Sequence, residues 1–217
     1  MAKNIAIVLN NGSLNSAVVA ALASQSHRTI MLYAQTTPAP LPRSRAAFDQ
    51  QVAHFKPYRE HALAIPYWSP LGAASAAYSA DPRQPGSLAP KLVELLPLIA
   101  VALRLAAHYQ AAALYLGLRV GNNADELAAA TEYLQILDEL VQLPCRQTDL
   151  HVLAPLLELE PWQVVDLGYQ VNAPFDKTWS CLDQAPEPCW ACAACHTRDD
   201  AFQHAAKTDP SKIARNG

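Results

Sequence analysis

Apolar runs and helical stripes alternate along most of this chain. Residues 5–9 form an apolar run that ends at a polar turn, residues 14–24 have helical composition, and residues 27–35 contain a second apolar run. A strand, a tight turn, a helix and a second strand within about thirty residues are typical of a βαβ unit in a parallel sheet. We therefore predict strands over 3–9 and 27–35 that are joined by a helix over 14–24.

The same alternation continues toward the C-terminus. It predicts further strands over residues 62–67, 113–120 and 150–157, and further helices over residues 45–55, 90–109, 123–142 and 161–168. Gly168 is expected to end the last of these helices. The pattern indicates an α/β fold, with an open, mostly parallel five-stranded sheet and helices on both faces, over residues 1–170. Residues 171–217 are expected to form a C-terminal segment packed on that sheet.

Composition narrows the class of protein. The chain has 217 residues, of which 51% are hydrophobic and 16% are charged, so it has enough apolar material for the core of one domain. Its net charge of −3 argues against a protein that binds nucleic acid by bulk electrostatics. The apolar run over residues 5–9 is too short for the core of a signal peptide. We expect a cytoplasmic protein with neither a membrane nor a nucleic acid as partner.

The longest apolar stretch covers residues 95–118. Pro97 lies near one of its ends, and Arg104 lies inside it. A charge at the centre of a membrane is costly, so we interpret this stretch as a buried helix that runs into a buried strand.

Four of the five cysteines lie in one short C-terminal segment. They are spaced C-x7-C-x2-C-x2-C, at positions Cys181, Cys189, Cys192 and Cys195. Short gaps bring thiolates together on one ion, and zinc accepts four sulfur ligands at about 2.3 Å. A closed set of four cysteines leaves no position for a substrate, so we predict a structural zinc site in the C-terminal segment.

Other kinds of site are also built from closely spaced cysteines. An iron–sulfur cluster also takes four thiolates. Disulfides are disfavoured in a cytoplasmic chain, and a thioredoxin-like redox pair uses one C-x-x-C motif, whereas here two such motifs share Cys192. His196 follows the last cysteine, but four thiolates already complete the shell, so we interpret this histidine as a surface residue.

The turn after the first predicted strand is the second candidate site. In an α/β fold, the N–H groups and the positive dipole end of the following helix attract anions at this place, and Ser13 and Ser16 add hydroxyl donors. The chain contains neither the Walker A lysine motif nor G-x-G-x-x-G, so the two commonest nucleotide loops are absent. A plain strand-to-helix connection with a polar cap would have the same composition.

A longer motif precedes the cysteines. The stretch VLAPLLELEPWQVVDLGYQVNAPFDKTWSC runs straight into the cysteines, and Tyr33-Ala34-Gln35 and Leu116-Gly117 follow two of the predicted strands. In these features the chain resembles the 7-cyano-7-deazaguanine synthases, which are ATP-dependent ligases of the queuosine pathway. Their fold is a pyrophosphate-loop fold of the adenine-nucleotide hydrolase-like class. The resemblance spans the whole chain and is most specific from about residue 152 to residue 195.

The resemblance implies a reaction and its partners. ATP would bind with Mg²⁺ and place its pyrophosphate on the first turn. The carboxylate of 7-carboxy-7-deazaguanine would be activated as an adenylate, ammonia would convert it to an amide, and a second activation would give the nitrile. Zinc at the cysteines and a homodimer are also implied. The residues expected to bind the nucleotide are Asn10, Asn11, Gly12, Ser13, Leu14, Asn15, Ser16, Ala17 and Arg119. No catalytic residue is assigned.

The first turn also departs from the family pattern. The family's Ser-Gly-Gly-Leu-Asp-Ser corresponds here to residues 11–16, which read Asn-Gly-Ser-Leu-Asn-Ser. Ser13 adds a Cβ where a glycine lets phosphate approach closely, and Asn15 removes a carboxylate that would help to hold Mg²⁺. The alternative hypothesis is a divergent member with lost or altered ATP chemistry, which is a binding protein or acts on another substrate.

Overall fold

The fold is built on one parallel sheet. A computed structural model describes residues 4–35, 41–65, 88–145, 149–183 and 185–213. Within these ranges, five strands pair in the order β3-β2-β1-β4-β5, and every pairing is parallel. The strands are β1 (Ile5–Leu9), β2 (Arg28–Gln35), β3 (Arg59–Ala64), β4 (Ala113–Tyr115) and β5 (His151–Leu153). The predicted fold class is confirmed.

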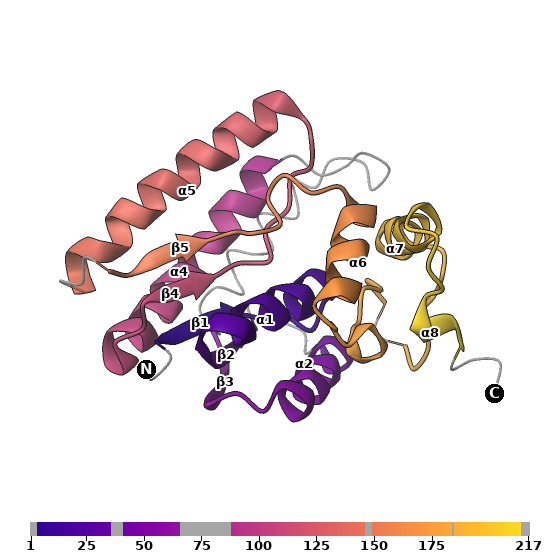
Figure 1. Cartoon of the computed structure of the whole chain (residues 1–217), viewed down its shortest axis with the longest axis horizontal. Coiled ribbons are helices and arrows are strands. Elements are labelled where there is room, and N and C mark those ends of the chain that lie inside the picture. The colour runs from indigo at the N-terminus through magenta and orange to yellow at the C-terminus, as the bar shows by residue number, and fades with distance from the viewer. Residues whose placement is uncertain (1–3, 36–40, 66–87, 146–148, 184, 214–217) are drawn as a thin grey trace.

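Helices cover both faces of the sheet (Figure 1). One face carries α1 (Leu14–Ser26), α2 (Pro42–Phe55) and α6 (Pro161–Gln170). The opposite face carries α4 (Leu88–Tyr109) and α5 (Ala124–Cys145).

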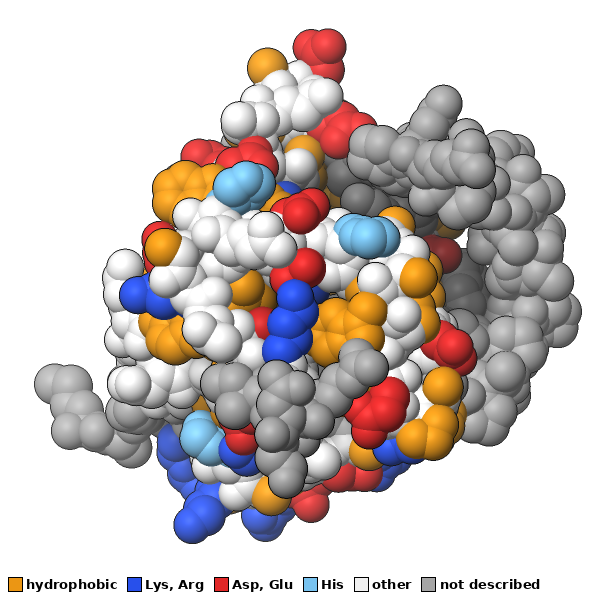
Figure 2. All heavy atoms as spheres, turned by 90° about the vertical axis from the view of Figure 1, so that its right-hand side faces the viewer, with side chains coloured by type: hydrophobic (Ala, Val, Ile, Leu, Met, Phe, Trp, Pro, Cys, Tyr) orange, Lys and Arg blue, Asp and Glu red, His pale blue; other side chains and the backbone are white. Residues whose placement is uncertain are grey.

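The C-terminal segment adds three short elements. They are a 3-10 turn, η3 (Phe175–Lys177), and the helices α7 (Ala193–His204) and α8 (Pro210–Ile213). The face that these elements form shows acidic and basic side chains interspersed with apolar ones (Figure 2). No single sign of charge therefore dominates the described part of that face.

Alternate residues of β1 enter two separate cores. Ala6 and Val8 join the cluster beneath α1 and α6, whereas Ile7 joins the cluster beneath α4 and α5. All three are completely buried, as expected for the central strand of a parallel sheet that is covered on both faces. The order of the strands reverses between β1 and β4. Open α/β sheets bind ligands at such a switch point, outside the carboxyl ends of the strands.

Several boundaries differ from the sequence-based predictions. The strands predicted over 113–120 and 150–157 are each only three residues long. Beyond them the two segments stay joined by isolated hydrogen bonds, such as that from the N–H of Val120 to the carbonyl of Leu157 at 2.9 Å. The strand predicted over 62–67 begins at Arg59, and residues 66 and 67 lie outside the described part of the chain. The helix predicted from 45 begins at Pro42, because proline is favoured in a first turn.

Gly168 does not end its helix, because α6 continues to Gln170. A Cβ at Gly168 would lie 2.2 Å from Cζ of Phe175 and 2.9 Å from a methyl group of Val18. The glycine therefore permits the close approach of α6 to η3 and α1.

The C-terminal segment shares the core of the sheet domain. Phe175 and Phe202 are buried in the same cluster as Val18, and the N–H of Trp179 donates to the carbonyl of Gly12 at 2.9 Å. This segment therefore forms part of the surroundings of the first turn.

Helix α4 is long and apolar enough to cross a membrane by length and composition alone. It packs against the sheet and α5 through a stripe that contains Ile99, Ala102 and Ala106. Of its apolar window Leu92–Tyr109, 22% is buried. The prediction of a buried helix therefore holds for one stripe of α4 and not for its whole circumference.

Candidate functional site

A buried amide network holds the turn between β1 and α1. Nδ2 of Asn10 donates to Oε1 of Gln51 at 2.8 Å, and Nε2 of Gln51 donates to the carbonyls of Gly12 and Lys177 at 3.1 and 3.0 Å. Asn10 and Gln51 are 3% and 0% exposed, so their polar groups depend on these partners. The network ties the turn to α2 and to the C-terminal segment.

Gly12 has a conformation that only glycine adopts easily here. Its φ is +80°, and a Cβ would lie 2.3 Å from the carbonyl oxygen of Ser44. The close approach of the turn to α2 therefore requires this residue.

Side chains of the turn satisfy the backbone donors of the turn itself. Oγ of Ser13, the N-cap of α1, accepts from the N–H of Ser16 at 3.3 Å. Oδ1 of Asn11 accepts from the N–H of Ser13 at 3.1 Å and from the hydroxyl of Ser16 at 2.9 Å. An anion that binds these N–H groups must first displace the side chains of Ser13 and Asn11.

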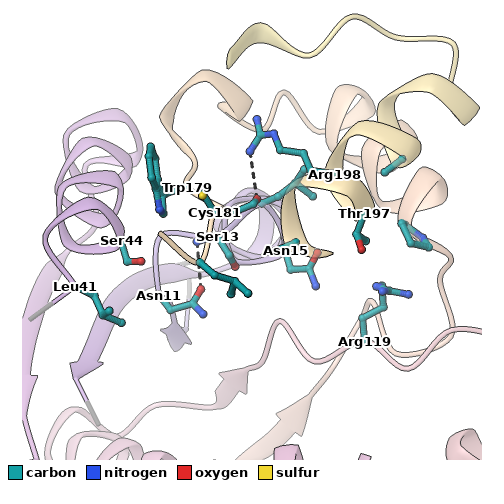
Figure 3. A pocket seen from close by; sticks show the side chains of 16 residues that line it. Asn11, Ser13, Asn15, Leu41, Ser44, Arg119, Trp179, Cys181, Thr197 and Arg198 are labelled. Carbon is teal, nitrogen blue, oxygen red and sulfur yellow. Dashed lines mark hydrogen bonds between the residues drawn. The ribbon is translucent and has the colours of Figure 1, made fainter. Parts of the chain in front are cut away.

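A cavity of about 490 Å³ lies between this turn and the cysteine segment. We call it the loop–cysteine cavity. Trp179 and Ser44 lie on one side of it, and Arg119 and Thr197 lie on the other (Figure 3). Its other lining residues are Asn11, Ser13, Leu14, Asn15, Leu41, Pro161, Ser180, Cys181, Leu182, Ala194, Arg198 and Ala201.

A second cavity of about 370 Å³ lies over the carboxyl ends of β1, β2 and β4. We call it the sheet-edge cavity. Apolar side chains such as Leu9, Leu32 and Leu98 form much of its wall, and Glu94 is its acidic residue. The two cavities share lining residues at the turn and at Arg119, so they adjoin each other there.

The predicted nucleotide-binding residues fall into three groups. Four of them line both cavities, namely Asn11, Ser13, Asn15 and Arg119. Three line one cavity, namely Leu14 on the loop–cysteine side and Asn10 and Ser16 on the sheet-edge side. Gly12 and Ala17 line neither cavity. Ala17 is completely buried in the core, so it supports the helix and cannot contact a ligand.

Arg119 brings a positive charge to the border of the two cavities. Burial lowers the pKa of its guanidinium, and the charge of Glu160 partly offsets that shift. Its hydrogen bond to the carbonyl of Leu159 is long, at 3.5 Å. Arg119 forms no ion pair with any residue that the structure describes. This guanidinium is therefore available to an anion.

The donor set does not fit Mg²⁺. This ion prefers carboxylate oxygens in addition to water and phosphate. No Asp or Glu lines the loop–cysteine cavity among the described residues, and Asn15 stands at the position of the family's aspartate. Among the described residues, the loop–cysteine cavity therefore offers no protein carboxylate to the Mg²⁺ that the sequence led us to expect, and Glu94 lines only the neighbouring sheet-edge cavity.

The four cysteines converge as their spacing predicts. Their Sγ atoms all lie within 4.8 Å of one another, and those of Cys181 and Cys189 are 3.4 Å apart. Four thiolates around one zinc ion at about 2.3 Å would be about 3.8 Å apart. The cluster can thus hold one metal ion, and its donor chemistry fits zinc or iron.

Hydrogen bonds prepare one of these thiols to lose its proton. Burial raises the pKa of Cys192, but the N–H groups of Leu182 and Cys195 and the neighbouring thiols outweigh it and lower this pKa to about 6. Burial raises the pKa of Cys181 and, more strongly, that of Cys195. A bound cation would favour the thiolate form of all four groups.

Two residues of the site were missed by sequence reasoning. Gln51 follows Ala47 and Phe48 at helical spacing on the buried face of α2, so a polar residue on an apolar stripe could have revealed it. Arg198 lies in a charged stretch of α7, where no apolar stripe in the sequence makes it stand out from its neighbours. Its guanidinium donates to both carboxylate oxygens of Asp209 at 2.6 and 2.8 Å and to Oγ1 of Thr178 at 2.7 Å.

Comparisons with known proteins place these features in context. A family model described as "Queuosine biosynthesis protein QueC" matches residues 93–206, slightly more than half of the chain. The 7-cyano-7-deazaguanine synthase of Trichodesmium erythraeum is 29% identical over 116 residues, which cover 52% of this chain and 52% of that protein. The 7-cyano-7-deazaguanine synthase of Parasynechococcus marenigrum is 28% identical over 225 residues, which cover 96% and 97% of the two chains.

A solved structure supports the fold. The U34-tRNA thiolase NcsA from Methanococcus maripaludis, which was solved with its 4Fe–4S cluster, matches with a TM-score of 0.53 at 14% identity. The match covers 99% of this chain and 70% of the thiolase. At this identity, the likeness concerns the fold alone.

Proposed function

This chain belongs to the family of queuosine biosynthesis protein QueC, and we propose that it is an ATP-dependent carbon–nitrogen ligase that makes 7-cyano-7-deazaguanine. Its substrates in this proposal are 7-carboxy-7-deazaguanine and ammonia. The observation that carries the proposal is the loop–cysteine cavity, which adjoins the sheet-edge cavity at the switch point of the sheet. The wall of this cavity from Arg119 to Ala201 lies inside the segment that matches the family model.

The proposed chemistry solves a leaving-group problem. A carboxylate reacts poorly with ammonia, because an oxygen would have to leave as hydroxide. In the proposed reaction, a carboxylate oxygen attacks the α-phosphorus of ATP and pyrophosphate leaves. Ammonia then displaces AMP and loses a proton to give the amide. A second ATP activates the amide oxygen in the same way, with loss of pyrophosphate, and loss of AMP and both N–H protons gives the nitrile.

The two cavities offer separate places for the parts of the ligands. The apolar wall of the sheet-edge cavity suits a flat heterocyclic base. The hydroxyl, amide and guanidinium groups of the loop–cysteine cavity suit phosphate and carboxylate oxygens. In this proposal the protein accelerates the reaction mainly by holding the carboxylate in line with the α-phosphorus.

We also propose that the metal at the cysteines is a structural zinc ion. Cys181 lines the loop–cysteine cavity and follows Trp179, which forms another part of its wall. With four thiolate ligands the ion has no open position for substrate, so it would fix the wall without taking part in the reaction. Elemental analysis of the purified protein distinguishes zinc from iron.

A coupled assay tests the proposed reaction. The protein is incubated with ATP, 7-carboxy-7-deazaguanine and ammonium, and pyrophosphate release and the nitrile product are measured. We expect release of pyrophosphate that depends on the carboxylate, and nitrile that forms only when ammonium is present. The absence of carboxylate-dependent release of pyrophosphate would contradict the proposal.

The homodimer and the cytoplasmic location stay predictions. Size-exclusion chromatography with light scattering tests the homodimer, and cell fractionation tests the location.

A further inference from the structure

The loop–cysteine cavity contains a positive charge that no carboxylate neutralises among the described residues of its lining. Two cations border it, and they differ in their partners. Arg198 is held by both oxygens of Asp209 in a buried ion pair. Arg119 has no such partner in the described part of the chain, although it is half-buried. A partly desolvated guanidinium without a counter-ion favours an anionic ligand.

The nearest acidic side chain is already engaged. The charge of Glu160 acts on Arg119, but its carboxylate accepts from the N–H of Asn122 at 3.1 Å and from the backbone of Gln163 at the start of α6. Its role as the cap of α6 explains its position. It does not line the loop–cysteine cavity.

Asn15 shows that the turn suits an amide and not a metal-binding carboxylate. Its Nδ2 donates to the carbonyl of Gly117 at 3.2 Å. An aspartate in the same place would point a negative oxygen at that carbonyl unless a cation lay between them. Trp179, on the opposite wall, adds a buried Nε1–H that has no acceptor among the described residues.

We propose that the loop–cysteine cavity binds a phosphate oxyanion without a divalent metal ion, and that Arg119 supplies the neutralising charge. A guanidinium can pair with two phosphate oxygens at once, which gives both charge and orientation. The inference concerns this cavity alone. It rests on the proposed function only for the statement that the natural phosphate ligand is ATP.

Inorganic pyrophosphate is the probe, because it does not need the sheet-edge cavity. Binding is measured by calorimetry on the full chain with its metal loaded, in buffer freed of Mg²⁺ by a chelating resin and again with excess Mg²⁺. We expect pyrophosphate to bind without Mg²⁺ at least as tightly as with it. A requirement for Mg²⁺, or no binding in either buffer, would overturn the inference.

Variants of the arginine test its assigned role. Arg119→Gln is expected to weaken binding of pyrophosphate without Mg²⁺ by about tenfold or more. Arg119→Lys is expected to restore only part of the affinity, because it keeps the charge but cannot pair with two phosphate oxygens at once. Arg104→Gln, at an exposed position on α4 outside both cavities, is the matched control and should bind like the parent protein. Equal affinity of Arg119→Gln and Arg104→Gln would contradict the assignment, with thermal melting as the check that both are folded.

A third variant reverses the proposed preference. Asn15→Asp is expected to bind pyrophosphate poorly without Mg²⁺ and to recover when Mg²⁺ is added, because the new carboxylate can share a cation with the ligand. Unchanged binding in both buffers would contradict the inference. Binding of pyrophosphate without Mg²⁺, together with no turnover of ATP, would support the proposed phosphate site and contradict the proposed ligase activity. Turnover of ATP that strictly needs Mg²⁺ at this cavity would support the ligase activity and contradict the proposed phosphate site.

Discussion

At the head of α1, single side chains decide whether the turn can receive a ligand. Ser13 occupies the N–H of Ser16, and Asn11 occupies the N–H of Ser13. These bonds are close to the length limit of ordinary hydrogen bonds, so a phosphate with several charged oxygens can replace them at moderate cost. The side chains of Ser13 and Asn11 therefore occupy the backbone donors of the turn with hydrogen bonds that a phosphate can replace.

Ser13→Gly tests this at the scale of one residue. The substitution frees the N–H of Ser16 and removes the Cβ, so the affinity for pyrophosphate should rise several-fold. A glycine N-cap should lower the free energy of unfolding by only a few tenths of a kcal/mol. Ser13→Ala is the control, because it removes the hydroxyl but keeps the Cβ. Unchanged affinity in the glycine variant would show that the ligand does not use these N–H groups.

The positions of single side chains could be predicted from the sequence where they depend on one continuous segment of the chain. The four cysteines could be placed together because their spacing alone brings the thiolates onto one ion. Arg119 could be placed at the edge of the sheet where the two cavities meet, because it follows a buried strand. Its role in binding a ligand stays a prediction. Gln51 could not be connected with Asn10 and Lys177, because that contact joins parts of the chain that only the tertiary fold brings together.

One buried ion pair connects the elements after residue 170 with one another. Arg198 on α7 and Asp209 before α8 have side chains that are 5% and 1% exposed. Arg198 also donates to Oγ1 of Thr178 and to the carbonyl of Phe175, so it connects α7 to the segment that enters the cysteine cluster. Removing one partner of such a pair leaves an uncompensated buried charge.

Asp209→Asn should therefore lower the free energy of unfolding by about 3 kcal/mol at neutral pH, measured by denaturant titration. Asp200→Asn, at an exposed position on α7, is the matched control and should change stability by less than about 0.5 kcal/mol. A loss in Asp209→Asn no larger than in the control would contradict the role of the pair.

The same pair predicts a dependence on pH. Burial raises the pKa of Asp209, but the hydrogen bonds and charge of Arg198 outweigh it and hold this pKa below its ordinary value. A lowered pKa in the folded state means that the contribution is fully present above about pH 4, the pKa of an unfolded aspartate, and is lost as the pH falls further. The difference in stability between the parent protein and Asp209→Asn should shrink below that pH.

Strand and helix prediction worked best in the first half of the chain. The apolar runs of β1 and β2 identify these two strands clearly in the sequence. Strands β4 and β5 are only three residues long, and each continues into an apolar segment that no longer pairs as a regular strand. Helix α7 has charged residues on much of its surface and buries only four side chains, so its stripe is too weak to find. Tertiary packing against α6 decides its position.

At the scale of the whole molecule, the cysteine segment and the sheet domain together form the wall of the loop–cysteine cavity. The sheet domain supplies the turn and Arg119, and the cysteine segment supplies Trp179 and Cys181. The wall formed by that segment contains few buried apolar side chains near the cysteines, so a metal ion would be its main source of order.

Cys189→Ala tests this coupling. The variant should lose its metal, lower the melting temperature and weaken binding of pyrophosphate, because one wall of the loop–cysteine cavity is released. His196→Ala, beside the cluster and exposed, is the control and should keep the metal. Metal content by elemental analysis, together with calorimetry, separates loss of the ion from loss of the ligand site. A Cys189→Ala protein that keeps its metal, or binds pyrophosphate normally, would contradict the coupling.

The transfer of oxygen from substrate to AMP tests the central claim of ligase chemistry most directly. The 7-carboxy-7-deazaguanine is labelled with ¹⁸O in both carboxylate positions and turned over with ATP and ammonium, and the AMP is examined by mass spectrometry. Because each activation joins a substrate oxygen to the α-phosphorus, we predict two molecules of AMP for each nitrile, each with one labelled oxygen. Unlabelled AMP, or formation of ADP and phosphate in its place, would contradict activation of the substrate by adenylation.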